Sequence, residues 1–316
     1  MIFTSPSVRH LALSQMLLAV LLANLNPIFS KILYARGWTP ASLYFVTLII
    51  VGIVLLIHEY IDFDRHMRWQ MRKRDFFGVL ITTLTGGVLA PLFFFTGLQH
   101  VTASESIILS SMLPFFVVFF GIFLLGERFR RQMLFGGFFI VCGVLVILWP
   151  DMQAFHMSKG VPFILGSTFF GAMTTIVHKK YIKHRHLDSV VLIRTLLAII
   201  IVGLWMILFE PTGFQILSAP ENIWLLLSVP IFAFILPYFL FFNALKTIKA
   251  IDAGVIEAAG RVLAVVAASV ILHEPLTSFH LLSMVFIVFG VLFINVPLTK
   301  WKIVPSRLME MGPLRK

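Results

Sequence analysis

The sequence predicts an all-α polytopic membrane protein whose ten transmembrane helices form two inverted repeats of five helices. Three observations lead to this fold class: an apolar composition, ten long apolar segments and an internal duplication. Of 316 residues, 59% are hydrophobic and 12% are charged, and the mean hydropathy is +0.98. Soluble globular domains are much more polar, so this chain needs a lipid environment.

The duplication is clearest in residues 98–149. A shift of 147 residues places FIVCGVLVI (139–147) on FIVFGVLFI (286–294), with seven identities in nine positions, and places Glu127 on Glu274. Self-similarity at a fixed spacing marks a repeat architecture. We therefore predict two halves: a first repeat at 1–150 and a second repeat, with a short basic tail, at 151–316.

Each half contains five segments of the roughly 20 apolar residues that cross a bilayer of about 30 Å. The first segment lacks a small-residue cleavage site, so it is interpreted as a retained helix. Because five crossings are an odd number, the second half must be inserted upside down, as in many secondary transporters. The predicted segments are 9–34, 41–58, 75–97, 102–125, 131–149, 160–180, 188–209, 221–245, 252–273 and 278–297.

The orientation follows from Lys and Arg, which accumulate on the cytoplasmic side of membrane proteins. Lys31, Arg36 and Lys159 lie on one predicted side. The other side therefore faces the cytoplasm and holds both termini, and its charge is a topology signal and a contact for anionic lipids rather than for nucleic acid. Its basic residues are Arg9, Arg65, Arg68, Arg72, Lys73, Arg74, Arg128, Arg130, Arg131, Lys179, Lys180, Lys183, Arg185, Lys246, Lys249, Lys300, Lys302, Arg307, Arg315 and Lys316.

A motif set in 98–149 consists of Ala103-Ser104, Pro114, Leu125-Gly126-Glu127-Arg128 and a Gly-rich helix. It resembles the EamA family of the drug/metabolite transporter superfamily, and a degenerate copy at 245–296 resembles that family's second repeat. The resemblance implies a ten-helix carrier of the bacterial inner membrane, commonly an exporter of amino acids or other small metabolites.

The chain departs from the family pattern at two positions. The second helix of a repeat often carries an Arg, which is present as Arg194, whereas Thr47 stands at the aligned position of the first half. The Pro of the fourth helix, Pro114, is replaced by Arg261 in the ninth. Both changes alter the polar content of the predicted bundle.

Glu257 and Arg261 are the strongest candidates for substrate binding. Their i, i+4 spacing puts both on one helix face, about 7 Å and 13 Å into the bilayer. An ionisable group at such depth costs roughly 2.5–3.5 kcal/mol, so it should face a cavity or a partner. Either Arg261 binds a carboxylate or phosphate while Glu257 binds an amine or exchanges a proton, or the two form a neutralised pair that lets the helix insert.

Further candidates for substrate binding lie at predicted kinks. Asn24 and Asn26 lie just before Pro27, which removes a backbone hydrogen bond and frees a carbonyl. Thr83 lies on the third segment, which carries Gly and Pro, and Asn243 lies on the eighth, which carries two prolines; Ser110 lies on the fourth. Each either lines a cavity or packs and hydrogen-bonds within the bundle.

Three charged residues are candidates for a gate or for coupling, in addition to Glu257. Glu105 and Lys31 lie near the non-cytoplasmic ends of their segments and form either an outer gate or separate interfacial contacts. Arg194 lies about 9 Å from a cytoplasmic helix end, where it either snorkels or binds an anion. Glu127 and Glu274 are interpreted as structural residues at helix ends.

No enzyme motif is present, and the one cysteine, Cys142, lies in an apolar segment, so we expect no catalytic activity, cofactor or metal. The sequence favours a secondary carrier for a small molecule, most simply an exporter of amino acids or related metabolites, by alternating access and with possible proton coupling. Uptake or exchange of nucleotide or sugar-phosphate anions, a lipid-phosphate enzyme and a helper protein without a transport cycle are the alternatives. The oligomeric state, monomer or homodimer, is left open.

Overall fold

The computed structural model describes residues 6–61, 73–127, 131–154, 157–182, 187–211, 213, 223–248 and 250–295, and this part of the chain forms helices and no strand. Ten spans are long and apolar enough to cross a membrane, which confirms the predicted segments to within a few residues. The helices are α1 (Pro6–Ala23), α2 (Asn26–Tyr34), α3 (Pro40–Ile61), α5 (Lys73–Thr82), η1 (Thr83–Leu89), α6 (Ala90–Leu98), α7 (Ala103–Ser110), α8 (Leu113–Leu125), α9 (Arg131–Gln153), α10 (Gly160–Val177), η2 (His178–Ile182), α11 (Leu187–Phe209), α12 (Ile223–Ser228), η5 (Val229–Ile235), α13 (Leu236–Leu245), α14 (Ala250–Leu272) and α15 (Ser278–Asn295).

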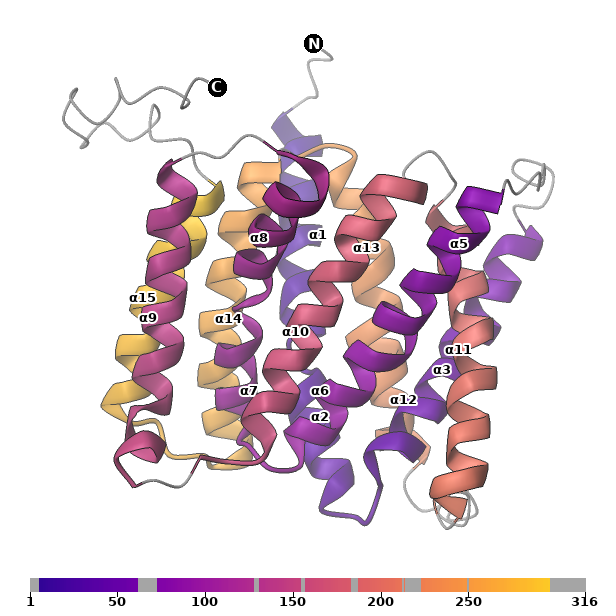
Figure 1. Cartoon of the computed structure of the whole chain (residues 1–316), viewed down its shortest axis with the longest axis horizontal. Helices are drawn as coiled ribbons and strands as arrows, with labels where there is room; N and C mark the ends of the chain where they lie inside the picture. Colours follow the sequence, from indigo (N-terminus) through magenta and orange to yellow (C-terminus); the bar gives the residue numbers. More distant parts are fainter. Residues whose placement is uncertain are drawn as a thin grey trace.

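The helices run up and down in one bundle (Figure 1). α1 begins and α15 ends at the same end of the bundle, here named the terminal face, and the other end is named the opposite face. Much of the topology prediction rests on basic residues that lie outside the described residues or whose side chains are not described. These are the basic residues at 9, 65, 68, 72, 128, 130, 183, 185 and 249 and those of the tail.

Two spans are broken ahead of a proline. The first divides into α1 and α2 just before Pro27, and the fourth divides into α7 and α8 just before Pro114. A proline lacks the N–H that would bond the carbonyl four residues earlier, so the helix must open there. The predicted kink in the first helix is confirmed. α14 is unbroken because Arg261 occupies the position equivalent to Pro114.

The third and eighth spans each contain a π-helical segment. η1 covers Thr83–Leu89 and η5 covers Val229–Ile235, so after the 147-residue shift the two differ by one residue. Each is followed within two residues by a proline, Pro91 or Pro237, and wide π turns are a usual response to an interrupted hydrogen-bond ladder. The predicted matching distortions of the two halves are confirmed.

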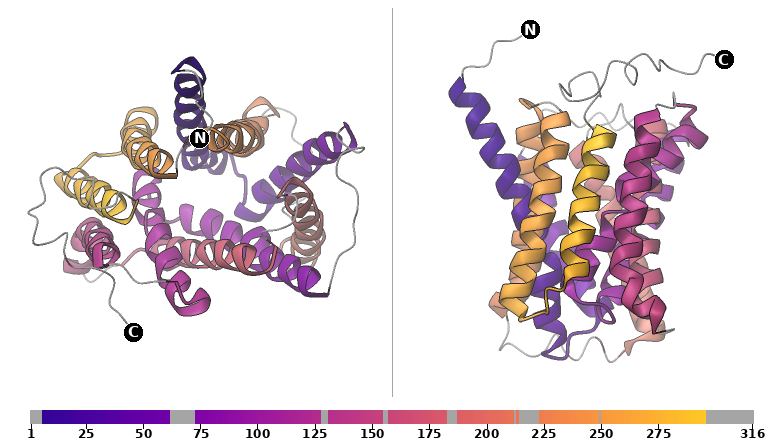
Figure 2. Two further views of the ribbon diagram at one scale, coloured as in Figure 1. Left: turned by 90° about the horizontal axis from the view of Figure 1, so that it is seen from above. Right: turned by 90° about the vertical axis from the view of Figure 1, so that its left-hand side faces the viewer.

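The repeated Gly-rich helices α9 and α15 pack directly on each other (Figure 2). A Cβ on Gly136 would lie 2.7 Å from the Gly290 carbonyl, and the Ser283 Oγ donates to the Gly143 carbonyl at 2.6 Å. Residue numbers rise along one helix as they fall along the other, so these equivalent helices are antiparallel. Glycine is required here because the two backbones touch.

We expect Gly290→Leu to destabilise the protein by about 1–3 kcal/mol or more, since the side chain would enter the backbone of α9. A Cβ at this position already meets the Gly136 carbonyl at 2.8 Å. The midpoint of thermal unfolding in detergent measures the effect. Val285→Leu, on the exposed side of the same helix, is the matched control; equal stability of the two variants would contradict the packing described.

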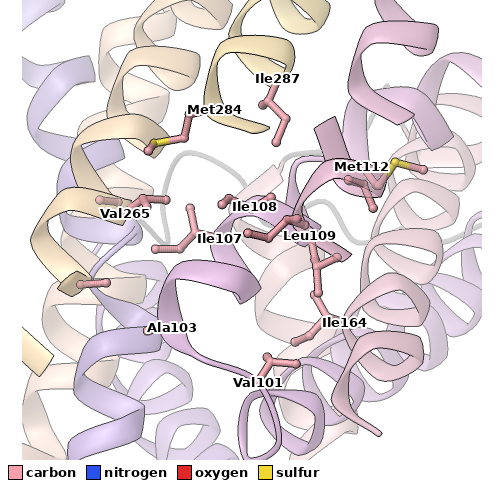
Figure 3. Close-up of a cluster of buried hydrophobic side chains, with 14 of the residues drawn as sticks. Val101, Ala103, Ile107, Ile108, Leu109, Met112, Ile164, Val265, Met284 and Ile287 are labelled. Carbon is pink, nitrogen blue, oxygen red and sulfur yellow. The ribbon is translucent and has the colours of Figure 1, made fainter. Parts of the chain in front are cut away.

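The largest apolar core is built around α7. Ile107, Ile108 and Leu109 are almost completely buried and pack against Val265 of α14 and Ile287 of α15 (Figure 3). α7 belongs to the first half, whereas α14 and α15 belong to the second. The opposite-face part of the fourth span is therefore held by apolar contacts that cross between the halves.

Candidate substrate site

A cavity of about 140 Å³ lies between helices of both halves. α3, η1 and α6 border it from the first half, and α11, η5 and α13 border it from the second. Most lining positions form pairs that the 147-residue shift relates, so the cavity lies where the duplicated elements meet. These pairs are Tyr44 and Val191, Thr47 and Arg194, Leu48 and Thr195, Gly87 and Phe234, and Pro91 and Tyr238.

Arg194 is the one charged side chain among the described residues that line this cavity. Its Cα lies about 10 Å along the helix from the first residue of α11. Gly87 leaves room for its stem, because a Cβ there would approach the Arg194 Cγ to 3.2 Å. Within the described part of the chain its guanidinium forms no hydrogen bond or ion pair. Arg194 therefore lines the cavity as a cation that has no counter-ion among the described residues.

The hydroxyl groups of the cavity wall are already engaged as donors. Thr47 donates to the Leu43 carbonyl at 2.8 Å, and Thr195 makes the same kind of bond to its own helix. Tyr44 donates to the Gly87 carbonyl at 2.5 Å, the carbonyl that Pro91 leaves without its helical partner. The cavity therefore offers a bound molecule the Arg194 N–H groups as donors and hydroxyl oxygens as acceptors.

Tyr44→Phe should destabilise the protein by roughly 1–3 kcal/mol, because a buried Gly87 carbonyl would lose its partner. Tyr60→Phe is the matched control, since Tyr60 is 81% exposed. Thermal unfolding of the two variants in the same detergent tests this. An unchanged midpoint for the Tyr44 variant would mean that the Tyr44 hydroxyl does not satisfy this carbonyl.

Acidic residues lie toward the terminal face of this site. The Tyr238 hydroxyl donates to the Asp188 carboxylate, and the Ser189 Oγ donates to the Glu59 carboxylate at 2.7 Å. Asp188 and Ser189 begin α11, and Glu59 ends α3. None of the three is among the lining residues, so the carboxylates are held in the wall and the cavity itself keeps a positive centre.

Glu257 and Arg261 form the ion pair that their spacing predicts. Their side chains are 42% and 13% exposed, and the Arg261 Nη1 is buried without a hydrogen-bond partner. Arg261 borders a void of about 10 Å³ beside Ile107 and Ser111, which holds roughly one water molecule. The pair is separate from the cavity that contains Arg194.

The other predicted binding residues make local contacts and do not line the larger cavity. Asn24 donates to the Val20 carbonyl at 2.7 Å, and Asn26 accepts from Ser30 at 3.0 Å. Thr83 donates to the Val79 carbonyl at 2.8 Å, and Asn243 donates to Gln15 of α1 at 3.2 Å. Ser110 ends α7 and is partly buried. Their roles in binding stay predictions.

Glu105 and Lys31, the residues of the predicted outer gate, are not joined by a salt bridge among the described residues, and their gating role stays a prediction. Glu105 forms a capping box with Thr102. The Glu274 carboxylate accepts hydrogen bonds from the Ala103 N–H at 2.7 Å and the Ser104 N–H at 2.9 Å, and also from the Ser104 hydroxyl. An acid of the second half thus caps the first-half helix α7 at the opposite face, where the helix dipole favours it.

Glu127, the equivalent of Glu274, makes a different contact. Both acids follow a left-handed residue, Gly126 with φ 65° and His273 with φ 55°, so the two turns match. The 147-residue shift also relates Ala103, the first residue of α7, to the first residue of α14 at 250. Glu127 nevertheless pairs with Lys179 and forms no bond to α14 within the described residues. Among the described residues, the halves are joined by a cap at the opposite face, and no equivalent bond from Glu127 is present at the terminal face.

These observations define a polytopic helical membrane protein with a largely apolar cavity, containing one arginine, between two related halves. The EamA-like transporter family model matches the chain twice, over residues 10–149 and 158–296, so the chain belongs to this family of transporters. The two matches coincide with the duplicated halves.

Individual relatives are distant. An uncharacterized transporter of Bacillus subtilis, YetK, is 27% identical over 229 residues, which cover 70% of this chain and 68% of the relative. The pseudopaline exporter CntI of Pseudomonas aeruginosa is 26% identical over 110 residues, or 34% of this chain and 39% of CntI. One solved structure, titled "Crystal structure of protein", superposes with a TM-score of 0.62 at 17% identity, covers 92% of this chain and 96% of its own, and agrees with the fold.

Sequence reasoning identified Arg194 but not its surroundings. The mismatch between Thr47 and Arg194 was the signal that the second half carries a cation that the first lacks. Tyr44, Tyr238 and Asp188 were missed, because nothing local marks a hydroxyl that bonds a carbonyl or acid far along the chain.

Proposed function

We propose that the protein is a secondary carrier that exports a small organic metabolite, such as an amino acid or a related compound, by alternating access through the cavity between its halves. The observation that carries this proposal is the unequal use of two equivalent acids. Glu274 joins the halves at the opposite face, whereas within the described part of the chain Glu127 does not make the equivalent contact at the terminal face. This is the asymmetry expected of one state of a two-state carrier built from inverted halves.

In the other state Glu127 would cap α14 and Glu274 would release α7. The two states then differ by an exchange of equivalent contacts, so their free energies can lie within a few kcal/mol, as a transport cycle requires. The matching π segments η1 and η5 and the proline break before α8 supply the places where helices can bend.

The terminal face is proposed to be cytoplasmic. Described basic residues at that end include Arg131, Lys179, Lys180 and Lys246, against Lys31, Arg36 and Lys159 at the opposite end. This distribution agrees with the positive-inside rule. Reporter fusions after residues 129 and 275 should lie in different compartments; fusions in one compartment would contradict the inverted arrangement.

Transport should need no nucleotide hydrolysis. Purified protein in liposomes is expected to exchange a labelled substrate with the same internal substrate, tested across amino acids, carboxylates, nucleotides and sugar phosphates. Retained exchange in the absence of ATP supports a secondary carrier. Failure to exchange any compound, with protein that is folded and inserted, would count against it.

Proton coupling through Glu257 is a separate proposal, since Glu257 is the partly exposed member of an intramembrane ion pair. Glu257→Gln should remove the dependence of transport on a pH gradient while exchange at equal pH persists. The same variant showing full gradient dependence would reject the role.

A further inference from the structure

We propose that the cavity between the halves binds a small organic monocarboxylate with an apolar body, whose carboxylate pairs with Arg194. The inference rests on the proposed carrier function and narrows the substrate from small metabolites in general to amphipathic monoanions, so it favours carboxylates related to amino acids over the zwitterionic amino acids themselves. The inference is based on three properties of the site: its charge, the hydrogen-bond donors and acceptors that it offers, and its size.

The charge of the cavity calls for an anion. Arg194 is the one cation on the described lining, and it forms no ion pair or hydrogen bond with the described chain. A cation within the membrane is stabilised by a counter-ion or by water in a cavity. A planar guanidinium binds a carboxylate through two parallel N–H bonds, which is a strong charge-assisted arrangement.

The rest of the wall excludes a second charge on the ligand. Tyr44, Thr47, Thr195 and Tyr238 each donate their hydroxyl hydrogen within the protein, and the Asp188 and Glu59 carboxylates accept from Tyr238 and Ser189 outside the lining. Among the described lining residues, an ammonium group would find hydroxyl oxygens but no acid, and a second carboxylate would find no second cation. Zwitterions and dicarboxylates are therefore expected to bind less well than monocarboxylates.

The remaining surface suits a compact apolar body. The lining includes the aromatic side chains of Phe234 and Phe239 and aliphatic side chains such as Val51 and Leu55. The cavity volume of about 140 Å³ resembles that of apolar cavities, about 150 Å³, which take up a benzene molecule. Phenylacetate, with one carboxylate and one ring, is a suitable probe, and nucleotides are too large.

The test measures binding and exchange with the full-length protein. Phenylacetate should raise the thermal midpoint and support exchange in liposomes, whereas phenylalanine, phenylethylamine and succinate should do so weakly. Arg194→Gln should weaken phenylacetate binding by roughly 10- to 100-fold, the loss expected for hydrogen bonds to a charged group. Without ligand its midpoint should equal or exceed that of the wild type, since an unpaired cation has been removed.

Lys246→Gln removes the same charge from an exposed position at the end of α13 and should bind phenylacetate like the wild type. Arg194→Lys keeps the charge without the planar guanidinium, so this variant should bind phenylacetate with intermediate affinity. It tests the role of Arg194 even if the Gln variant fails to fold. Unchanged affinity in either Arg194 variant would overturn the proposal. Exchange of phenylalanine but not phenylacetate would also overturn it while leaving the carrier function intact; exchange of no compound would count against the carrier function itself.

Discussion

Glu274→Ala should open the opposite face of the bundle and lower the stability of the observed state by roughly 2–4 kcal/mol. The carboxylate accepts three hydrogen bonds at the start of α7, two of them from backbone N–H groups. Hydrogen bonds to a charged acceptor are worth about 1.5–3 kcal/mol each and are not additive, and the loss of a helix cap alone costs about 1 kcal/mol. This contact also joins the two halves, so its removal should shift the conformational equilibrium as well.

A cysteine at Ser110, in a chain in which Cys142 is replaced by Ala, reports the opening. Ser110 is the last residue of α7 and is partly buried, and Glu274 caps the first residues of the same helix. A membrane-impermeant maleimide applied at the opposite face should label this cysteine faster in the Glu274→Ala chain.

The matched control is Glu127→Ala, the same change at the equivalent position. The Glu127–Lys179 pair is about half exposed, and such pairs contribute about 0–1 kcal/mol. We expect a small effect on stability and no increase in labelling from the opposite face. Equal behaviour of the two variants would contradict the distinct roles assigned to the two acids.

Glu257→Ala should destabilise the protein by about 1–3 kcal/mol, the cost of leaving a little-exposed donor group without its partner. It would leave the Arg261 guanidinium, 13% exposed and with one nitrogen already unpartnered, without its counter-ion. Removing one member of a buried ion pair is far more costly than removing both. The double variant Glu257→Ala/Arg261→Met should therefore recover most of the lost stability.

Thermal unfolding of the wild type, both single variants and the double variant forms a double-mutant cycle. A large coupling free energy would show that the ion pair with Glu257 is what stabilises the Arg261 side chain at its position in α14. If the double variant is as unstable as Glu257→Ala, the instability arises from packing rather than from an uncompensated charge. Packing is a realistic alternative cause, because α14 lies close to α1 here: Gly260 packs directly on Val20.

The fold was predictable from the sequence because its main signals are local. Ten apolar segments of bilayer length and a repeat with a 147-residue spacing determine the helix count and the equivalence of the halves. The breaks before Pro27 and Pro114 follow from the missing N–H of proline. The Glu257–Arg261 pair was also predictable, since both residues lie on one helix face.

The cavity was less predictable, because its wall is made by residues far apart in the chain. Tyr44 meets the Gly87 carbonyl across two helices, and Glu274 caps a helix 170 residues earlier. Glu105 was predicted to form an outer gate, and in the structure its carboxylate forms a capping box with Thr102 at the start of its own helix. The depth of a residue in its helix can be calculated from sequence, but the neighbour it faces depends on tertiary packing.

The most direct test of alternating access is a paired distance measurement by double electron–electron resonance. One spin-label pair, at His100 and Leu276, spans the halves at the opposite face, and a second pair, at Leu124 and Lys246, spans them at the terminal face. In the Cys142→Ala background, Glu274→Ala should lengthen the first distance and shorten the second. Distances that change in the same direction, or that both stay fixed while the protein transports, would contradict the exchange of contacts between the two faces.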